Sequence, residues 1–454
     1  MNRKLLLISA NQYCSPYPIY PIGISYLSTY LKTELPDFEI LSFDMNFKTL
    51  EQLAIFIQEQ KPDYIGVSIR NIDNSNSYDG TNSIPAYNKI IHIVRQQSSK
   101  PLIIGGAGFS IYAQTLFETF QPDFAIKGEG EKSLTDLLNC LENNLDYTKI
   151  QGLIYRDEND KIIINPRNEF ARRLSVHFDP DLIGYYWDHS GMLNIQTKRG
   201  CFHKCIYCSY PLIEGTTVRC LDNDEIVENL ERLQREKGIN YVFFTDSLFN
   251  IANKHNVELA EKIIRRNLKI SWAAYFSPSN ITDEEMAIYK HSGLSHIEFG
   301  TESFSNQQLH NYGKNFTFDQ VITTSEMALK HNVFYAHFLI LGGYGETNET
   351  LSETFNNSKK LRYTVLFPFV GMRIYPGTIL QQYAINDGII KADDNLLEPK
   401  YYISKNFDQS TLKEKAYATG KAWIFPDDLQ NDEIEKFRIK RKKKGLIWEY
   451  LRLP

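Results

Sequence analysis

Three cysteines that could ligate a metal lie close together near the middle of the chain, in the stretch TKRGCFHKCIYCSYP. The chain has six cysteines in 454 residues, and half of them fall here: Cys201, Cys205 and Cys208. Thiolates ligate soft or borderline metals, and a structural zinc site usually takes four ligands in two close pairs. Cys220 and His203 are the nearby candidates for a fourth zinc ligand, and neither has a usual pair spacing.

A set of three thiolates is better matched to a four-iron four-sulfur cluster in which one iron is open to another ligand. A zinc site and three unrelated buried cysteines are the alternatives that the spacing leaves open. If the cluster interpretation holds, the vacant iron is the functional feature of the loop.

The spacing CxxxCxxC, with an aromatic residue just before the last cysteine, resembles the signature of the radical S-adenosylmethionine (SAM) superfamily. Three more stretches resemble motifs of that family at the ends of its second, fourth and sixth strands. They are FFTDSLFN (243–250), HIEFGTESF (296–304) and MRIYPGT (372–378). The resemblance spans residues 190–385, and it is carried by four separate motifs.

This resemblance implies a mechanism and a set of site residues. S-adenosylmethionine would chelate the open iron, and one electron would cleave it to a 5′-deoxyadenosyl radical. The three cysteines would be both the metal ligands and the catalytic residues, and an electron donor such as a flavodoxin or ferredoxin would be a partner. Tyr207 would lie against the adenine, Glu302 and Ser303 would hydrogen-bond the ribose or amino group, and Arg373 would pair with the carboxylate. Glu302 as a helix cap and Arg373 as a structural ion pair are the alternatives.

One position departs from the family pattern. The loop LGGYGET (341–347) has Tyr344 where relatives commonly carry proline. Simple loop variation explains the difference, and a tyrosine that faces the substrate is the alternative.

Glycines cluster at two expected strand ends in the first part of the chain, and they would let the backbone approach a large ring or a phosphate closely. They are Gly105, Gly106 and Gly108 at one strand end, and Gly128 and Gly130 around Glu129 at the next. The pattern is not the dinucleotide fingerprint, so a nucleotide cofactor is a poor second. The surrounding stretches resemble the cobalamin-binding class of radical SAM enzymes: YPIYPIGISYLSTYL (17–31), GVSIRNIDN (66–74), IIGGAGFS (103–110) and IKGEGEKSL (126–134).

The motif DxHxxG, in which a histidine ligates cobalt, is absent from the sequence. The resemblance instead places the loop RNIDN beneath the cobalt, with Arg70 near the lower axial face and Asn71, Ile72 and Asp73 lining the corrin. A guanidinium has no free lone pair and cannot coordinate the metal, so it would leave that face unligated or bound to water. An ion pair at the strand end is the alternative for Arg70.

These residues need an α/β fold to bring them together. Short apolar runs at 4–10, 38–44, 63–69, 101–107 and 123–129 alternate with helical periods and predict a Rossmann-like, doubly wound parallel sheet. A second series at 193–198, 240–245, 270–275, 295–300, 334–341 and 366–374 predicts a partial (β/α)6 barrel. We therefore expect a cobalamin-binding domain over 1–145, a connector over 146–190 with a hairpin, a radical SAM barrel over 191–385 and a C-terminal region over 386–454.

Composition excludes several other classes. The formal net charge is −5 and the pI about 6.1, which gives no electrostatic reason to bind nucleic acid or an acidic membrane. The sequence contains neither a membrane-length apolar run nor a signal-peptide pattern at its start. We expect a cytoplasmic protein, whose clustered thiols are kept reduced.

The cofactor set of a [4Fe–4S] cluster, S-adenosylmethionine and cobalamin predicts a methyltransferase that moves a methyl group from methylcobalamin to a carbon of a small-molecule or peptide-borne substrate. A cyclase, ring-contracting or oxidative rearrangement enzyme with the same cofactors is the first alternative. A binding module without catalysis is the second.

Overall fold

The computed structural model describes residues 3–171, 177–428, 436–438 and 440–453. The chain divides into two compact units. The first comprises Met1–Asn74, Thr81–Asp188 and Leu212–Gly215, and the second comprises Ser75–Gly80, His189–Pro211 and Thr216–Pro454. Within the described residues, no helix is long and apolar enough to cross a membrane.

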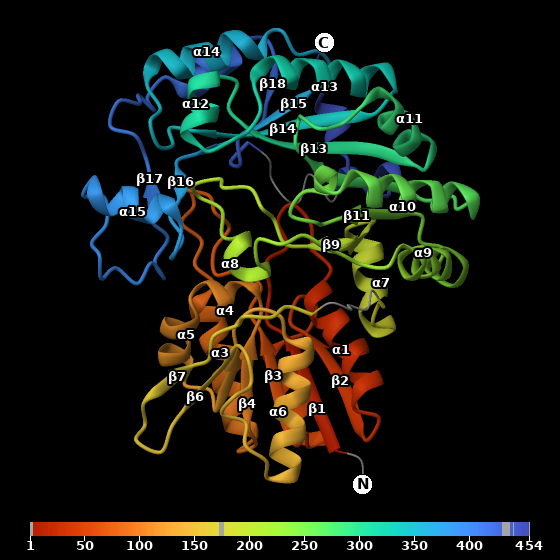
Figure 1. The fold of residues 1–454 in the computed structure, drawn as a ribbon, viewed down its shortest axis with the longest axis vertical. Coiled ribbons are helices and arrows are strands. Elements are labelled where there is room, and N and C mark those ends of the chain that lie inside the picture. The colour runs from red at the N-terminus through yellow and green to blue at the C-terminus, as the bar shows by residue number, and fades with distance from the viewer. Residues whose placement is uncertain (1–2, 172–176, 429–435, 439, 454) are drawn as a thin grey trace. The chain divides into compact units, whose positions relative to one another are not determined.

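The first unit is built on a seven-stranded sheet (Figure 1) with the order β2-β1-β3-β4-β5-β6-β7. Its strands are β1 Arg3–Ser9, β2 Phe38–Asp44, β3 Tyr64–Ser68, β4 Leu102–Gly105, β5 Phe124–Ile126, β6 Leu153–Arg156 and β7 Ile162–Ile164. The first five are parallel, as predicted from their buried apolar runs. The expected hairpin is β6 and β7, but it pairs antiparallel with β5 and so extends this sheet instead of standing apart as a connector.

Helices cover both faces of this sheet, as a doubly wound fold requires (Figure 1). The helices of this unit are α1 Ile22–Glu34, α2 Leu50–Gln60, α3 Ile84–Gln97, α4 Ala107–Ile111, α5 Ala113–Phe120, α6 Glu131–Asn143 and α7 Pro180–His189. Helix α1 packs beside α6, and α2 packs beside α3. The carboxyl ends of the parallel strands, where this fold binds ligands, carry the loops after β3, β4 and β5.

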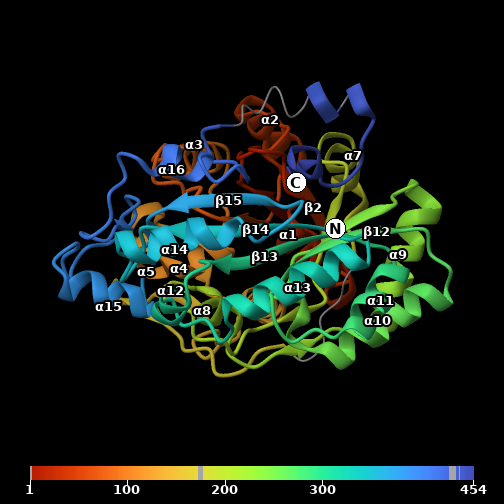
Figure 2. The same ribbon diagram turned by 90° about the horizontal axis from the view of Figure 1, so that it is seen from above.

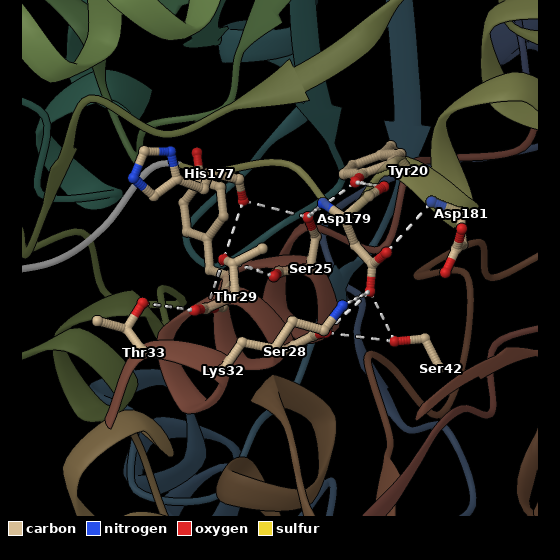
Figure 3. A network of polar contacts seen from close by, with 11 residues as sticks. Tyr20, Ser25, Ser28, Thr29, Lys32, Thr33, Ser42, His177, Asp179 and Asp181 are labelled. Atoms are coloured by element: carbon tan, nitrogen blue, oxygen red, sulfur yellow. Dashed lines mark hydrogen bonds and ion pairs between the residues drawn. The ribbon is translucent and has the colours of Figure 1, made fainter. Parts of the chain in front are cut away.

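A buried carboxylate ties the segment before α7 to the first helix and second strand (Figure 3). The Asp179 Oδ2 atom accepts hydrogen bonds from Ser28 Oγ at 2.8 Å and Ser42 Oγ at 2.7 Å, and Asp179 is fully buried. The Asp179 backbone N–H donates to Ser25 Oγ at 2.8 Å. The latter part of the predicted connector is therefore an integral part of the first unit.

The second unit contains a seven-stranded sheet with the order β18-β15-β14-β13-β12-β11-β8. Its strands are β8 Leu193–Ile195, β11 Tyr241–Phe244, β12 Ser271–Phe276, β13 Leu294–Glu302, β14 Phe334–Leu341, β15 Val365–Val370 and β18 Ala422–Trp423. All neighbours are parallel, and the six strands expected from the sequence follow one another in chain order, as in a partial barrel. The last of them stops earlier than predicted, because Gly371 has φ +74° and separates β15 from the short β16 Met372–Arg373.

Helices flank this sheet on one side (Figure 2). They include α9 Asn223–Lys237, α10 Asn253–Arg265, α11 Asp283–His291, α12 Asn306–Asn311, α13 Phe318–Lys330 and α14 Asn348–Ser358, with α15 Ile379–Asn386 farther along the chain. The apolar core on the helix side takes residues from β14 and β15, such as Leu339 and Leu366, and alternate residues such as Phe338 face the other way.

The C-terminal region also belongs to this unit rather than forming a separate part. Phe407, Leu412, Trp423 and Phe425 are buried in the same core as the barrel strands. Apart from β18, the region contains β17 Tyr401–Tyr402, α16 Leu412–Tyr417 and the 3₁₀ turn η2 Trp448–Leu451. It therefore completes the second hydrophobic core.

Candidate functional site

The start of the cysteine loop is fixed by one buried carboxylate. Asp246 follows β11, and its Oδ1 atom accepts the backbone N–H groups of Thr197 at 2.6 Å and Lys198 at 3.1 Å. Its Oδ2 atom accepts Thr197 Oγ1 and Lys198 Nζ, both at 2.6 Å, and all three side chains are buried. Because every polar group of this buried pair is hydrogen-bonded, the pair holds the backbone at the start of the cysteine loop in one conformation. Asp246 lies in the motif FFTDSLFN, but the sequence did not reveal this role.

Other contacts hold the loop farther along. Ser247 Oγ donates to the Gly200 carbonyl at 3.3 Å, and the Ile206 N–H donates to the Tyr312 carbonyl at 3.2 Å. A Cβ atom on Gly313 would lie 2.6 Å from the Lys204 carbonyl oxygen, so the segment after α12 packs directly against the loop. These contacts fix the path of the loop that carries the cysteines.

The three thiols interact electrostatically with one another, and Cys201 is buried while Cys205 and Cys208 are half-buried. Burial raises the pKa of Cys201, and it raises the pKa of Cys208 to about 12. Metal binding would therefore have to displace protons from these thiols. The donor set fits an iron–sulfur cluster.

A zinc site receives no support from the described part of the chain. There, no group of three or more His, Cys, Asp or Glu side chains is close enough to hold a single metal ion. Cys220 lies on β10 Arg219–Cys220 and is exposed, and burial lowers the pKa of His203. Thiolates around a cluster bind different iron atoms and stand farther apart than ligands of one ion, so this finding leaves the cluster interpretation intact.

A polar network connects the loop to the end of β13. Tyr207 Oη donates to Glu302 Oε1 at 2.7 Å, and Lys314 Nζ lies 3.2 Å from the same oxygen. The Glu302 and Lys314 side chains are only 13% and 10% exposed. Although burial opposes it, the Glu302 carboxylate raises the pKa of Lys314, which therefore stays charged. Lys314 follows a short helix and no strand, so no strand-end pattern in the sequence indicated it.

The backbone at Glu302 is in an unusual conformation. Its φ is +69°, and the pairing of β13 with β14 shifts register between Gly300 and Glu302. Left-handed non-glycine residues and bulges concentrate at functional sites. The side chain expected to bind the cofactor thus stands at the strained end of a central strand.

Ser303, the neighbour of Glu302, is engaged within the fold. It is fully buried, its Oγ atom lies 3.0 Å from Thr354 Oγ1 on α14, and it accepts the N–H of Ser305. A cofactor contact at Ser303 would have to add to these bonds, and it stays a prediction.

Arg373 is likewise occupied by the chain. It is buried, and its guanidinium donates to the carbonyls of Ile374 at 2.6 Å and Leu396 at 3.0 Å. It therefore fastens the segment after α15 in this structure. Its pairing with a cofactor carboxylate stays a prediction.

Tyr344 belongs to a cluster of aromatic rings. It stacks on Tyr383 with 4.4 Å between ring centroids, and it makes a T-shaped contact with Tyr402 with 5.5 Å between ring centroids. These contacts give the residue a packing role that a proline could not fill.

In the first unit, the glycines after β4 pack against the loop after β3. A Cβ atom on Gly106 would lie 2.4 Å from the Ile69 carbonyl oxygen, and one on Gly108 would lie 2.8 Å from the Asn71 Cα atom. The contact between the two loops thus explains both glycines without a cofactor. Gly105 and Gly130 show only ordinary contacts at those positions.

The loop RNIDN has two features that are typical of a ligand site. Arg70 is exposed at the carboxyl edge of the sheet, whereas Ile72 and Asp73 are buried. Asn71 Oδ1 is buried and accepts no hydrogen bond from the described residues, although Asn71 Nδ2 donates to the Asp73 carbonyl at 2.7 Å. An exposed cation beside an unsatisfied buried acceptor fits a large polar cofactor at this edge.

The third loop of this edge, around Glu129, is held by Arg167 from the predicted connector. The guanidinium donates to the carbonyls of Lys127 at 3.1 Å and Glu129 at 2.8 Å. A Cβ atom on Gly128 would lie 2.9 Å from Arg167 Nε, so this glycine makes room for the arginine. Ser110 Oγ donates to the Gly106 carbonyl and accepts the Gly128 N–H, both at 2.8 Å, which joins two loops of the site.

Comparisons with known proteins assign one domain to the first unit of the chain and another to the second. The profile of the Radical SAM superfamily matches residues 195–357, and that of the B12 binding domain matches residues 9–138. An uncharacterized methyltransferase of Pyrococcus horikoshii is 27% identical over 95% of this chain and 94% of its own length. An anaerobic magnesium-protoporphyrin IX monomethyl ester cyclase of Rubrivivax gelatinosus is 23% identical over 75% of this chain and 62% of its own.

Among solved structures, the radical SAM methyltransferase TsrM from Kitasatospora setae, with cobalamin and a [4Fe–4S] cluster bound, superposes with a TM-score of 0.87. The match covers 100% of this chain and 98% of that one at 21% identity, which shows a shared fold. The two matched profiles are those of the domains expected to use a [4Fe–4S] cluster, S-adenosylmethionine and cobalamin. The chain therefore contains a B12-binding domain over residues 9–138 and a radical SAM domain over residues 195–357.

Proposed function

We propose that this chain is a cobalamin-dependent radical SAM methyltransferase that transfers a methyl group to a carbon atom of a small-molecule or peptide-borne substrate. The observation that carries the proposal is that the three-cysteine loop and the B12-binding domain occur in one chain that an uncharacterized methyltransferase matches almost end to end. The methyltransferase TsrM, whose fold this chain shares, supports the same reading. A role in specialised metabolism rests on family analogy alone.

Each part of the chain has a defined task in this function. Cys201, Cys205 and Cys208 would hold the cluster, and Asp246 fixes the loop that carries them. Glu302 offers a carboxylate to the polar groups of S-adenosylmethionine, and Tyr207 would lie against its adenine. When bound, the cluster and S-adenosylmethionine supply one-electron and methyl-donor chemistry, and cobalamin carries the methyl group.

In the first unit, Arg70 would lie near the lower face of the corrin, because it is exposed at the end of the third strand. Asn71 would offer its unsatisfied amide oxygen to a donor on the cofactor. The loops that carry Gly106 and Gly128 would form the rest of the cobalamin-binding site.

The experiment that tests the proposal uses the full chain, reconstituted anaerobically with iron, sulfide and hydroxocobalamin. Reduction in the presence of S-adenosylmethionine with a deuterated methyl group should transfer that label to the bound cobalamin. With a substrate, the product should gain the mass of one labelled methyl group. Failure of the label to reach cobalamin in a protein that holds both cofactors would contradict the proposal.

A cyclase or other oxidative rearrangement enzyme is the second candidate, and the similarity to the anaerobic cyclase favours it. The mass of the product separates the two, because a cyclase product gains no methyl group. Formation of 5′-deoxyadenosine in proportion to product would further show that hydrogen abstraction is used. If the methylated product forms without 5′-deoxyadenosine, the reaction does not use hydrogen abstraction.

A flavodoxin or ferredoxin is the electron donor that we propose, and the cytoplasm is the compartment. The three thiols of the cysteine loop are free, which suits a reducing environment. Support of turnover by a purified flavodoxin system in place of a chemical reductant would test the donor.

A further inference from the structure

Lys314 is a largely buried cation that lies beside the cysteine loop and that no motif accounts for. Its Nζ atom lies 3.2 Å from Glu302 Oε1 and donates to the Gly300 carbonyl at 3.2 Å. It also lies 5.5 Å from the centroid of the Tyr207 ring, which sits on the loop between Cys205 and Cys208. The backbone just before it packs on the loop at Lys204, so its position is built into the fold.

The charge of Lys314 acts on every thiol of the loop. It interacts electrostatically with Cys201, Cys205 and Cys208. Because its side chain is only 10% exposed, solvent and salt screen this interaction much less than they screen a surface charge. Glu302, the partner of Lys314 in the ion pair, places a negative charge 3.2 Å from the Lys314 ammonium.

We propose that Lys314 and Glu302 form a largely buried charge pair that sets the reduction potential of the cluster held by the three cysteines, and that Lys314 is the positioning residue for Glu302. Reduction adds negative charge to a cluster, so a nearby cation favours the reduced form and a nearby anion opposes it. Lys314 and Tyr207 both bind Oε1, and the described residues donate no hydrogen bond to Oε2, which leaves that oxygen for a ligand. The inference rests on the cluster of the proposed function.

The test is a redox titration of the reconstituted full chain without S-adenosylmethionine, followed by electron paramagnetic resonance of the reduced cluster. In Lys314→Met the midpoint potential should fall, because Glu302 loses its counter-charge. In Glu302→Gln it should rise, because Lys314 is then unopposed. The double variant should return toward the wild-type potential, as expected for two charges that compensate each other.

Two further variants control for structural damage. Lys314→Arg keeps the charge and should stay near the wild-type potential. Lys204→Met removes an exposed charge from the same loop and should change little, because solvent screens it.

Iron and sulfide content separate the possible failures. If the wild type assembles no cluster, the proposed function fails and not merely this inference. If clusters form but the two single variants leave the potential unchanged or shift it in the same direction, the charge-pair inference is wrong. Should Lys314→Met not fold, Glu302→Gln must still raise the potential and Lys314→Arg must still preserve it.

Discussion

Asp246 illustrates how one residue prepares a metal site without touching the metal. Its carboxylate accepts two backbone N–H groups, one hydroxyl and one ammonium at the point where the cysteine loop leaves the sheet. Lys198 is as deeply buried as its partner. Removing the charge of Asp246 would leave that ammonium uncompensated in a dry environment, which is the costly way to break a buried pair.

We therefore predict that Asp246→Asn destabilises the second unit by about 3–5 kcal/mol and strongly reduces cluster content. The measurements are denaturant unfolding of the apoprotein and iron content after reconstitution. Asp224→Asn is the matched control, because Asp224 is 66% exposed and pairs with Lys262 at the surface. Solvent screens such a surface pair, so its loss should change the free energy of unfolding little. Equal effects of the two substitutions would contradict the role of Asp246.

Glu298 gives a second prediction at this scale. It lies on β13, is 5% exposed and accepts a hydrogen bond from Trp448 Nε1 at 3.1 Å. Burial raises the pKa of Glu298 to about 7. Because the pKa is higher in the folded than in the unfolded chain, the stability due to this group is present below pH ~4.5 and is lost as the pH rises to about 7.

Glu298→Gln keeps the acceptor for Trp448 and removes the titration. At pH 8 the variant should be more stable than the wild type, by up to about 3 kcal/mol. The difference should shrink toward pH 5. Unfolding of both proteins across this range measures it, and parallel stability curves would show that Glu298 does not titrate as inferred.

At the scale of elements, the strands and their parallel pairing were predictable, whereas the extension of the first sheet by β6 and β7 was not. Buried apolar runs predicted β1 to β5 and the barrel strands, because a parallel strand is apolar on both faces. The hairpin of β6 and β7 was also predicted, but sheet membership depends on long-range pairing with β5 that no local pattern encodes.

The candidate site was predictable to the same extent. The three cysteines and Glu302 were predicted from motifs, whereas Lys314 and Asp246 act through contacts that only the fold creates. The glycines at 106 and 108 were recognised, but the structure attributes them to contact between two loops. A glycine in the sequence indicates a close approach of the backbone to another group, and only the fold identifies that group as the loop after β3.

That loop contact gives the element-scale prediction. Gly108→Ala places a methyl group 2.8 Å from the Asn71 Cα atom, so the loops after β3 and β4 must separate. We expect a loss of about 1–3 kcal/mol in stability and a clear loss of bound cobalamin, measured by absorbance after reconstitution. Gly184→Ala on α7 is the control, because a Cβ atom there meets nothing within 4 Å. Unaltered cobalamin binding in Gly108→Ala would show that the loop contact does not shape the site.

At the scale of the whole molecule, the two candidate cofactor sites lie in different compact units, each with its own sheet. The cysteine loop is anchored by Asp246 and Tyr312 in the second unit. The loops that carry Arg70 and Gly108 are anchored by one another in the first. We therefore expect each site to assemble without the other.

The two sites should consequently fail independently. Cys205→Ala should abolish cluster assembly and leave cobalamin binding near the wild-type level, whereas Gly108→Ala should show the reverse. Iron and cobalt contents of the same reconstituted samples measure both at once. Loss of cobalt together with iron in Cys205→Ala would mean that the sites assemble together, and a full cluster in that variant would mean that Cys205 is not a ligand.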